Sequence, residues 1–264
     1  MREAAVEFLV FGLKQARACV FSGSFFLLLA LSRVVDVPGL ARYDVLFLGA
    51  IALQLILIAT RLETVDEVKV IALFHLIGLA LELFKTSPAI RSWSYPEPCV
   101  FRIAGVPLYS GFMYAAVGSY MCQAWRILDL ELTDYPSYRI SVPLAAAIYL
   151  NFFAHHWLPD VRWILVALVI AAFWRTGVLY TVTTPRRRMP LALSFLLIGF
   201  FVWVAENIAT YFGAWSYPHQ RGGWRPVGLG KIGSWGLLVI LSFILVADLK
   251  HLKARRKVPA PAEA

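Results

Sequence analysis

Two glutamates, Glu82 and Glu206, are the residues best placed to do chemistry, because each lies near the end of a long apolar segment. Placing a carboxylate in hydrocarbon costs roughly 2.5–3.5 kcal/mol on insertion scales, so such residues are usually functional. A desolvated carboxyl group also holds its proton more tightly and can act as a general acid near neutral pH. Two such acids in matching positions could protonate an alkene or bind a cation. The alternative is that each reaches water or a basic side chain at its helix end.

His75 is the third candidate catalytic residue, together with Glu82 and Glu206. It precedes Glu82 by seven positions, which is two turns of a helix and places both side chains on one face. Gly78 lies between them and would let another helix or a ligand approach closely. A histidine and a glutamate on one inward face suit a proton relay or half of a metal site. A histidine hydrogen-bonded between helices is the plainer alternative.

The tetrapeptide Trp-Ser-Tyr-Pro occurs twice, at residues 93–96 and again at 215–218, each time shortly after one of the two glutamates. This repetition predicts two related units, about 18–125 and about 140–249. The aromatic rings could stack on a substrate or surround a cation, although Trp and Tyr are also common at membrane interfaces. The candidate substrate-binding residues are Trp93, Tyr95, Tyr114, Tyr211, Trp215 and Tyr217.

His155, His156 and Asp160 are further candidate metal ligands, and an interfacial cap is their alternative role. Adjacent helical residues point about 100° apart, so the two histidines rarely bind one ion together. Neither H-x-x-H nor H-x-x-x-H spacing occurs in the chain. The sequence therefore leaves the metal content and any cofactor unassigned.

The composition shows which solvent surrounds these residues. Of the 264 residues, 60% are apolar and 16% are charged, and the mean hydropathy is +0.69. Soluble domains are nearer 45–50% apolar and about 25% charged. The composition therefore excludes a soluble enzyme and a disordered scaffold, and three cysteines give no disulfide framework. Most of this protein is expected to lie in lipid.

A membrane-spanning helix needs about 20 mostly apolar residues. Eight segments approach that length, near 18–35, 44–60, 68–85, 106–125, 140–157, 161–180, 190–211 and 229–249. The sequence predicts an all-α fold: one integral membrane domain over 1–264, a polytopic bundle of about eight helices built as two parallel four-helix repeats.

Lysine and arginine set the expected orientation. They are more frequent at both termini and in the loops near 61–69, 126–139 and 181–189 than in the opposite loops, which makes the first side cytoplasmic. Residues 250–264 are then a basic cytoplasmic tail, while Arg175 lies inside an expected span. The net charge of +9 is explained by anionic lipid rather than by nucleic acid, because no base-reading element is visible.

Several stretches resemble a known family: FGLKQARA at 11–18, RLET at 61–64, KVIALFH at 69–75, GVPLYSGFMYAAVGSY at 105–120, YLNFF at 149–153 and AEN at 205–207. They resemble the YoaT-like bacterial multi-pass membrane proteins, domain-of-unknown-function family 817. That resemblance implies an inner-membrane protein and no established activity.

A fainter similarity is to the membrane carotenoid cyclases and hydratases, through Trp93-Ser94-Tyr95 and Gly105-Val106-Pro107. Leu108 and Tyr109 stand where the cyclases carry paired acids, which is a departure from their pattern.

Three functions fit these residues. The first is an enzyme that uses buried glutamic acid on a lipid-soluble substrate of isoprenoid or carotenoid type. The second is a transporter of small solutes or ions, and the third is a structural or sensory membrane component. An enzyme needs a closed apolar cavity with one or two acids, whereas a transporter needs polar groups that communicate with both faces. The clustering of candidates toward the outer side favours the enzyme at this stage, with membrane lipid as its surroundings and the oligomeric state unassigned.

Overall fold

The computed structural model describes residues 2–257, and side chains over 3–247. Most of this part of the chain is helical. The helices are α1 (Arg2–Ala18), α2 (Val20–Leu31), α3 (Arg42–Ala59), α4 (Val65–Lys85), α5 (Ser110–Ile127), α6 (Tyr138–Ala154), α7 (Arg162–Phe173), α8 (Leu191–Tyr211) and α9 (Lys231–Lys257). Of the expected basic tail, residues 258–264 and the side chains of 250–257 lie outside what the structure describes.

Each of the eight expected segments contains a helix, but two of these helices are short. α2 and α7 have 12 residues each, against the segments 18–35 and 161–180 predicted from hydropathy. After Phe173 the chain leaves the helix and residues 177–181 form strand β4 (Gly177–Thr181). Val178, Tyr180 and Thr181 belong to the β-branched and aromatic types that favour strands, which explains why the apolar run does not continue as helix.

Short antiparallel strands also correct the all-α prediction. β3 (Glu131–Thr133), β4 and β5 (Arg186–Pro190) form one sheet in that order, and β1 (Arg102–Ile103) pairs with β2 (Val106–Pro107). The turn between β1 and β2 consists of Ala104 and Gly105, both with positive φ, as tight hairpin turns require. A single 3-10 turn, η1 (Pro218–Gln220), completes the described elements.

Within the described residues, two helices are long and apolar enough to cross a membrane, α3 and α8. The helices α2, α6 and α7 and the stretch Lys231–Ala247 of α9 are apolar but shorter. Two such helices point to membrane association and do not by themselves establish the eight spans expected from the sequence.

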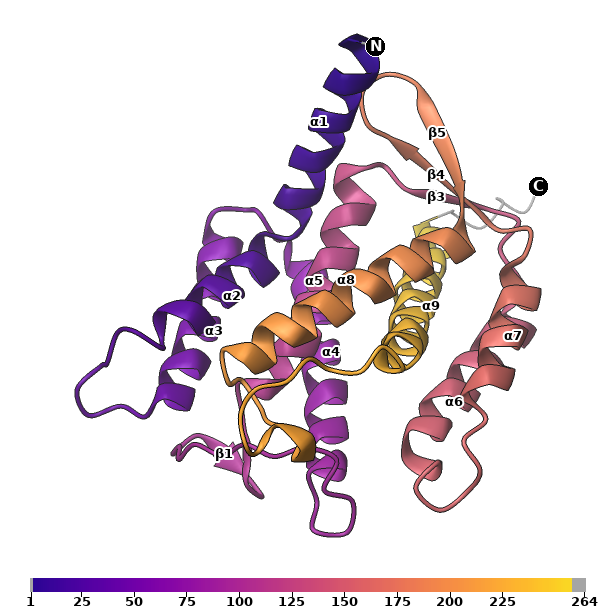
Figure 1. Ribbon diagram of the computed structural model, residues 1–264. Helices are drawn as coiled ribbons and strands as arrows, with labels where there is room; N and C mark the ends of the chain where they lie inside the picture. The colour runs from indigo at the N-terminus through magenta and orange to yellow at the C-terminus, as the bar shows by residue number, and fades with distance from the viewer. Residues whose placement is uncertain (1, 258–264) are drawn as a thin grey trace.

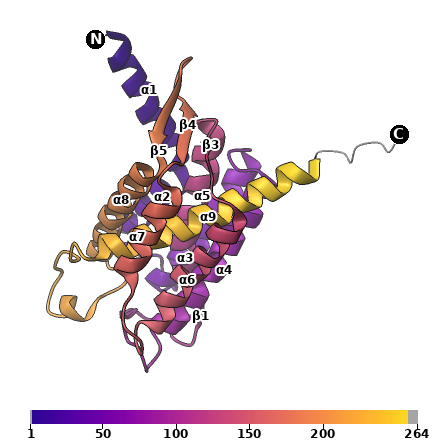
Figure 2. The same cartoon turned by 90° about the vertical axis from the view of Figure 1, so that its right-hand side faces the viewer.

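Helix α5 occupies the middle of the bundle and contacts α1, α2, α4 and α9. The tightest helix pairs are α4 with α5 and α8 with α9. The N-terminus of α1 and the β4–β5 hairpin lie toward one end of the bundle, at the top of Figure 1. The loops 86–109, 155–161 and 212–230 lie toward the other end, and Figure 2 shows the same separation from the side. The connections therefore alternate between two ends of the bundle.

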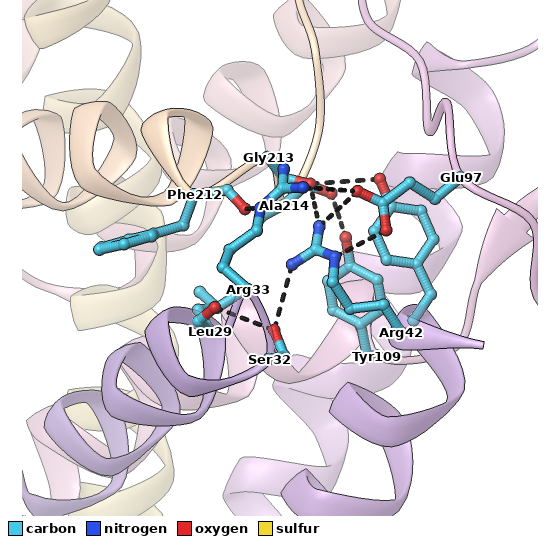
Figure 3. A network of polar contacts seen from close by, with 10 residues as sticks. Leu29, Ser32, Arg33, Arg42, Glu97, Tyr109, Phe212, Gly213 and Ala214 are labelled. Atoms are coloured by element: carbon cyan, nitrogen blue, oxygen red, sulfur yellow. Dashed lines mark hydrogen bonds and ion pairs between the residues drawn. The ribbon is translucent and has the colours of Figure 1, made fainter. Parts of the chain in front are cut away.

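Two arginines hold the end of α8 against the first half of the chain (Figure 3). Arg33 donates from Nε to the Phe212 carbonyl at 2.7 Å, and Arg42 donates to the Gly213 carbonyl at 2.6 Å. Carbonyls at a helix C-terminus lack partners within the helix and carry partial negative charge, so guanidinium groups suit them. Glu97 accepts two hydrogen bonds from Arg42, at 2.6 and 2.8 Å, and lies 3.3 Å from Arg33. This carboxylate keeps both arginines aimed at α8.

Replacing Glu97 should therefore destabilise the fold. Glu97→Ala leaves the Arg42 side chain, which is 13% exposed, without its charged partner. Hydrogen bonds to charged groups contribute about 1.5–3 kcal/mol, so we expect a loss of that order in the free energy of unfolding, measured by chemical unfolding in detergent. The control is Glu131→Ala, which removes an exposed pair with Arg186 and should cost less than about 1 kcal/mol. Equal losses for the two variants would contradict this account of the arginine contacts.

Candidate functional site

Glu82 lies in the last turn of α4, is 2% exposed, and has hydrogen-bond donors on both carboxylate oxygens. Oε2 accepts from the Trp93 indole Nε1 at 2.7 Å and from the Tyr95 hydroxyl at 2.7 Å. Oε1 accepts from the Tyr114 hydroxyl at 2.8 Å. Trp93 and Tyr95 come from the first Trp-Ser-Tyr-Pro segment, and Tyr114 comes from α5. The sequence thus predicted four residues that the structure brings together.

Glycine makes the approach of α5 to α4 close enough for this geometry. A Cβ on Gly78 would lie 2.3 Å from Cγ of Tyr114, so only glycine leaves room for that ring. Further along the same two helices, a Cβ on Gly118 would lie 2.9 Å from Cγ of Phe74. The prediction that Gly78 admits a neighbouring helix is confirmed. The side chain that it admits is Tyr114, whose hydroxyl donates to Glu82.

Glu206 has a similar environment in α8 and is also 2% exposed. Oε1 accepts from the Tyr217 hydroxyl at 2.5 Å, and Oε2 accepts from the Trp235 indole Nε1 at 2.6 Å. Tyr217 occupies the same place in its tetrapeptide as Tyr95 does in the first. Trp215 makes no hydrogen bond to Glu206 that the described contacts include; it is 7% exposed and packs in a hydrophobic cluster.

Sequence reasoning therefore missed Trp235. A signal for it was present, because α9 follows the second tetrapeptide as α5 follows the first. Trp235 lies on α9 near the place that Tyr114 has on α5, and each supplies a donor to the glutamate of the preceding helix.

The two carboxylate clusters are joined at the tetrapeptides. The Ser94 amide donates to the Ser216 carbonyl at 3.0 Å, and the Ser216 amide donates to the Ser94 carbonyl at 2.9 Å, in an antiparallel bridge. The ring of Trp93, bonded to Glu82, meets the ring of Tyr217, bonded to Glu206, edge to face at 6.0 Å between centroids. One connected site therefore extends from Glu82 to Glu206.

Lys231 supplies a positive charge to this site. Its Nζ lies 4.6 Å from the centroid of the Tyr217 ring and 5.7 Å from that of Trp93, within the range of cation–π attraction. It also lies 3.4 Å from the Tyr217 hydroxyl. The aromatic rings between the two glutamates thus already hold one cation, at the start of α9.

Two other candidates lie apart from the carboxylates. His75 packs edge to face on Phe112, with 4.5 Å between ring centroids, and its buried Nδ1 has no hydrogen-bond partner among the described residues. A Cβ on Gly111 would lie 2.7 Å from the imidazole, so the ring fills a gap in α5. Tyr211 is 62% exposed and contacts Phe212 and Trp224. The structure therefore does not bring His75 or Tyr211 into contact with either carboxylate.

The loop after α6 contains the proposed metal ligands. His155 Nδ1 lies 2.8 Å from the Asn151 carbonyl, and His156 Nε2 lies 2.9 Å from Nζ of Lys85. Asp160 is paired with Arg162 at 2.7 Å. In the part of the chain that the structure describes, no three His, Cys, Asp or Glu side chains are grouped as a metal site would require. Hydrogen bonding at the ends of α6 and α7 accounts for these contacts.

Another buried carboxylate, Glu63, was missed. It is 2% exposed, lies between α3 and α4, and accepts hydrogen bonds from the Gln54 amide and the Ser119 hydroxyl of α5. Beside it is a cavity of about 10 Å³ whose lining includes Arg17 and Gln123. A cavity of that size holds about one water molecule. Glu63 lies in a stretch rich in charged residues, and such a stretch predicts a solvated loop. The burial of Glu63 was therefore not predicted.

The chemistry of the site follows from its donors. Tyrosine hydroxyl and tryptophan N–H groups that point at a carboxylate stabilise its charged form and offset part of the cost of its burial. Five such hydrogen bonds converge on Glu82 and Glu206. The arrangement places two buried carboxylates beside aromatic rings that face the Lys231 ammonium, a combination of groups that attracts cations.

Comparison with known proteins gives a family match and one close relative. The family described as "Protein of unknown function (DUF817)" matches residues 7–243. The chain is 57% identical, over 95% of its own length and 94% of the relative's, to the "Uncharacterized protein YoaT" of Bacillus subtilis (strain 168). No solved structure matches significantly.

The close approach at Gly78 can be tested by substitution. Gly78→Ala puts a methyl group into the Tyr114 ring, and overpacking of this kind typically costs about 1–3 kcal/mol. We expect a lower thermal unfolding midpoint in detergent. The control is Gly23→Ala in α2, where nothing lies within 4 Å of the new Cβ and the helix should gain slightly. Unchanged midpoints for both variants would show that α4 and α5 do not meet as described.

His156 should make stability depend on pH. Burial, followed by the charges of Lys85 and His155, lowers the pKa of His156 from 6.5 to about 4. The unfolded chain then binds this proton more tightly than the folded one, so stability should fall as pH drops from about 6.5 to 4 and be unaffected by His156 above that range. His156→Gln should lose less stability than the parent protein between pH 7.5 and pH 5, measured by thermal unfolding. Identical losses of stability in His156→Gln and the parent protein would contradict the lowered pKa of His156.

Proposed function

The chain belongs to the DUF817 family of proteins of unknown function, and we propose that it is a multi-pass membrane protein that transports a monovalent cation, the proton included. The observation that carries this proposal is that helix α5 contacts buried carboxylates at two levels, Glu82 through Tyr114 and Glu63 through Ser119. A transporter needs polar groups that lead toward both faces, whereas a closed catalytic pocket does not.

The membrane part of the proposal is supported by the outer faces of the helices. Large apolar side chains there are well exposed, among them Leu27, Leu55, Leu150, Trp163, Leu196 and Phe201, each at least 60%. Exposed apolar surface of this extent marks contact with lipid or with another protein. We propose two four-helix units, α2–α5 and α6–α9, each with a Trp-Ser-Tyr-Pro segment between its third and fourth helices. Paired units of this kind place substrate sites at their interface in known transporters.

The orientation in the proposal is that of a bacterial inner membrane with both termini in the cytoplasm. The alternation of loops between two ends of the bundle supports it (Figure 1). The end with the β4–β5 hairpin carries Arg186, Arg187 and Arg188, as a cytoplasmic end should. Glu82 and Glu206 then lie toward the outer side and Glu63 toward the inner side.

The cation path in the proposal follows α5. Tyr114 and Ser119 are five residues apart, which is about 7.5 Å along a helix axis. A cation that reaches Glu82 from outside would then move along α5 from Tyr114 to Ser119, the residue that donates to Glu63. Lys231 is the internal cation that balances the site when no external one is bound, and displacing it from Trp93 and Tyr217 would open the outer cluster.

The enzyme hypothesis fits less well. A general acid must present a proton to its substrate. Here three protein donors surround Glu82 and occupy three of the about four lone-pair sites of its carboxylate, which leaves a site for a proton or a small ion but no open face for a bulky substrate. Nothing in these contacts selects an isoprenoid over another ligand.

Cation flux through the purified protein tests the proposal. We expect protein reconstituted into liposomes loaded with a pH-sensitive dye to dissipate an imposed proton gradient, and sodium or potassium gradients are assayed in parallel. Glu82→Gln, Glu206→Gln and Glu63→Gln each remove one carboxylate charge and should reduce flux at least about tenfold. A rise of about 1.4 kcal/mol in the free-energy barrier at any one of these carboxylates lowers the rate about tenfold.

The matched control is Glu131→Gln, which changes a carboxylate on β3 that is 56% exposed and should leave flux unchanged. Folding of each variant is checked by its unfolding midpoint. Flux no greater than that of empty liposomes for all three ions would overturn the proposal. A bound lipid-soluble molecule retained by that same inactive preparation, and lost in Glu82→Gln, would instead support the enzyme.

A further inference from the structure

Arg175, which the sequence placed inside a membrane span, lies instead at the mouth of a cavity. The cavity has a volume of about 750 Å³ and is lined by Asp134, Trp174, Arg175, Thr176, Arg188 and Pro190. It lies where α7 ends and the β3–β4–β5 sheet begins, toward the upper end of the bundle in Figure 1. Trp174 is 76% exposed beside it. A cavity of this size, with two arginines and a tryptophan, has room for a small ligand.

The two arginines of this cavity are less closely paired with carboxylates than the neighbouring Arg186 and Arg187. Arg186 is paired with Glu131 at 2.6 Å, and Arg187 donates to both oxygens of Glu7 at 2.9 and 2.6 Å. Arg188 approaches a carboxylate only at 3.8 Å, that of Asp134. The guanidinium of Arg175 has no hydrogen bond or ion pair with any residue that the structure describes.

The chain also positions the Arg188 guanidinium. A Cβ on Gly177 would lie 2.4 Å from Nε of Arg188, so the glycine leaves the space across which this side chain lies. Arg188 donates to the Arg175 carbonyl at 3.3 Å, which brings the two arginines to the same edge of the cavity. Thr176 is fixed in turn by a 3.0 Å hydrogen bond from its hydroxyl to the Asp134 carbonyl. These contacts place the Arg188 guanidinium and the Arg175 backbone at one edge of the cavity.

We infer that Arg175 and Arg188 bind the phosphate group of an anionic ligand in this cavity. Arginine recognises phosphate through paired N–H groups, and with Asp134 counted the cavity lining carries a net charge of about +1, which matches the single negative charge of a phosphodiester. An anionic phospholipid such as phosphatidylglycerol is the source that the surroundings favour. Trp174 is the residue type that lies at the headgroup level, and the exposed side chains of Ile164, Leu168 and Ile170 on α7 would lie along the acyl chains. This site is separate from the carboxylates of the proposed transport path.

Native mass spectrometry of the detergent-purified protein tests the inference with four probes: phosphatidylglycerol, phosphatidylcholine with the same acyl chains, glycerol 1-phosphate and inorganic phosphate. We expect phosphatidylglycerol to bind at least about tenfold more tightly than phosphatidylcholine, a difference of about 1.4 kcal/mol. Arg175→Ala and Arg188→Ala should each remove that preference. Arg186→Ala is the charge-matched control and should retain it, because the Arg186 charge is already paired.

Arg175→Lys and Arg188→Lys keep the charge but lose the paired N–H geometry, so each should bind phosphatidylglycerol at an intermediate level even if an alanine variant fails to fold. Equal binding of glycerol 1-phosphate and phosphatidylglycerol would support the phosphate site and identify a soluble phosphate ester as its ligand. The inference is overturned if no anionic probe binds more tightly than phosphatidylcholine, or if the Arg175 and Arg188 variants bind as the parent protein does.

Discussion

The structure depends on supplying hydrogen-bond donors to carboxylates that are buried in an apolar bundle. An ionised carboxylate without partners is too costly to bury, so the surrounding chain must bring polar N–H and O–H groups to it. Here tyrosine and tryptophan do this for Glu82 and Glu206. Such side chains carry a donor at the end of a large apolar ring, which lets them fill core volume while they satisfy an acid.

This requirement explains the packing around it. The donors must come from other helices and from loops that fold back, so α4 and α5 approach one another closely and glycine replaces larger residues where they meet. The tetrapeptide loops then lie over the ends of α4 and α8, where they pair with each other through Ser94 and Ser216. The same constraint thus accounts for a helix contact, two loop conformations and the junction between the halves of the chain.

The sequence predicted the presence of the helices well, because the apolar composition of a segment is enough to indicate that it contains a helix. Each apolar segment contains a helix, because lipid and core both require internally satisfied backbone. The ends of α2 and α7 were not predicted, because a hydropathy average does not register the change of backbone conformation at Thr176 and Gly177. Glu82 and Glu206 stood out because a lone acid in an apolar run is conspicuous.

Other parts of the site could not be predicted in this way. Glu63 was hidden among charged neighbours, and its burial arises from contacts with Gln54 and Ser119 that are distant in the sequence or on other helices. Trp235 resembles any interfacial tryptophan until the helix that carries it is placed beside α8. Both were missed because burial and partner choice are properties of the assembled helices.

The arginine contacts at the end of α8 have a consequence for motion. Arg33 and Arg42 lie in and beside the α2–α3 connection, yet they donate hydrogen bonds to the carbonyls of Phe212 and Gly213, which follow α8. Any rocking between the two halves must therefore carry the tip of α8 along with α2 and α3 as a single rigid body. Because α8 also packs closely on α9, this restraint extends to α9, so the two arginines limit relative movement of the two halves of the chain at this end of the bundle.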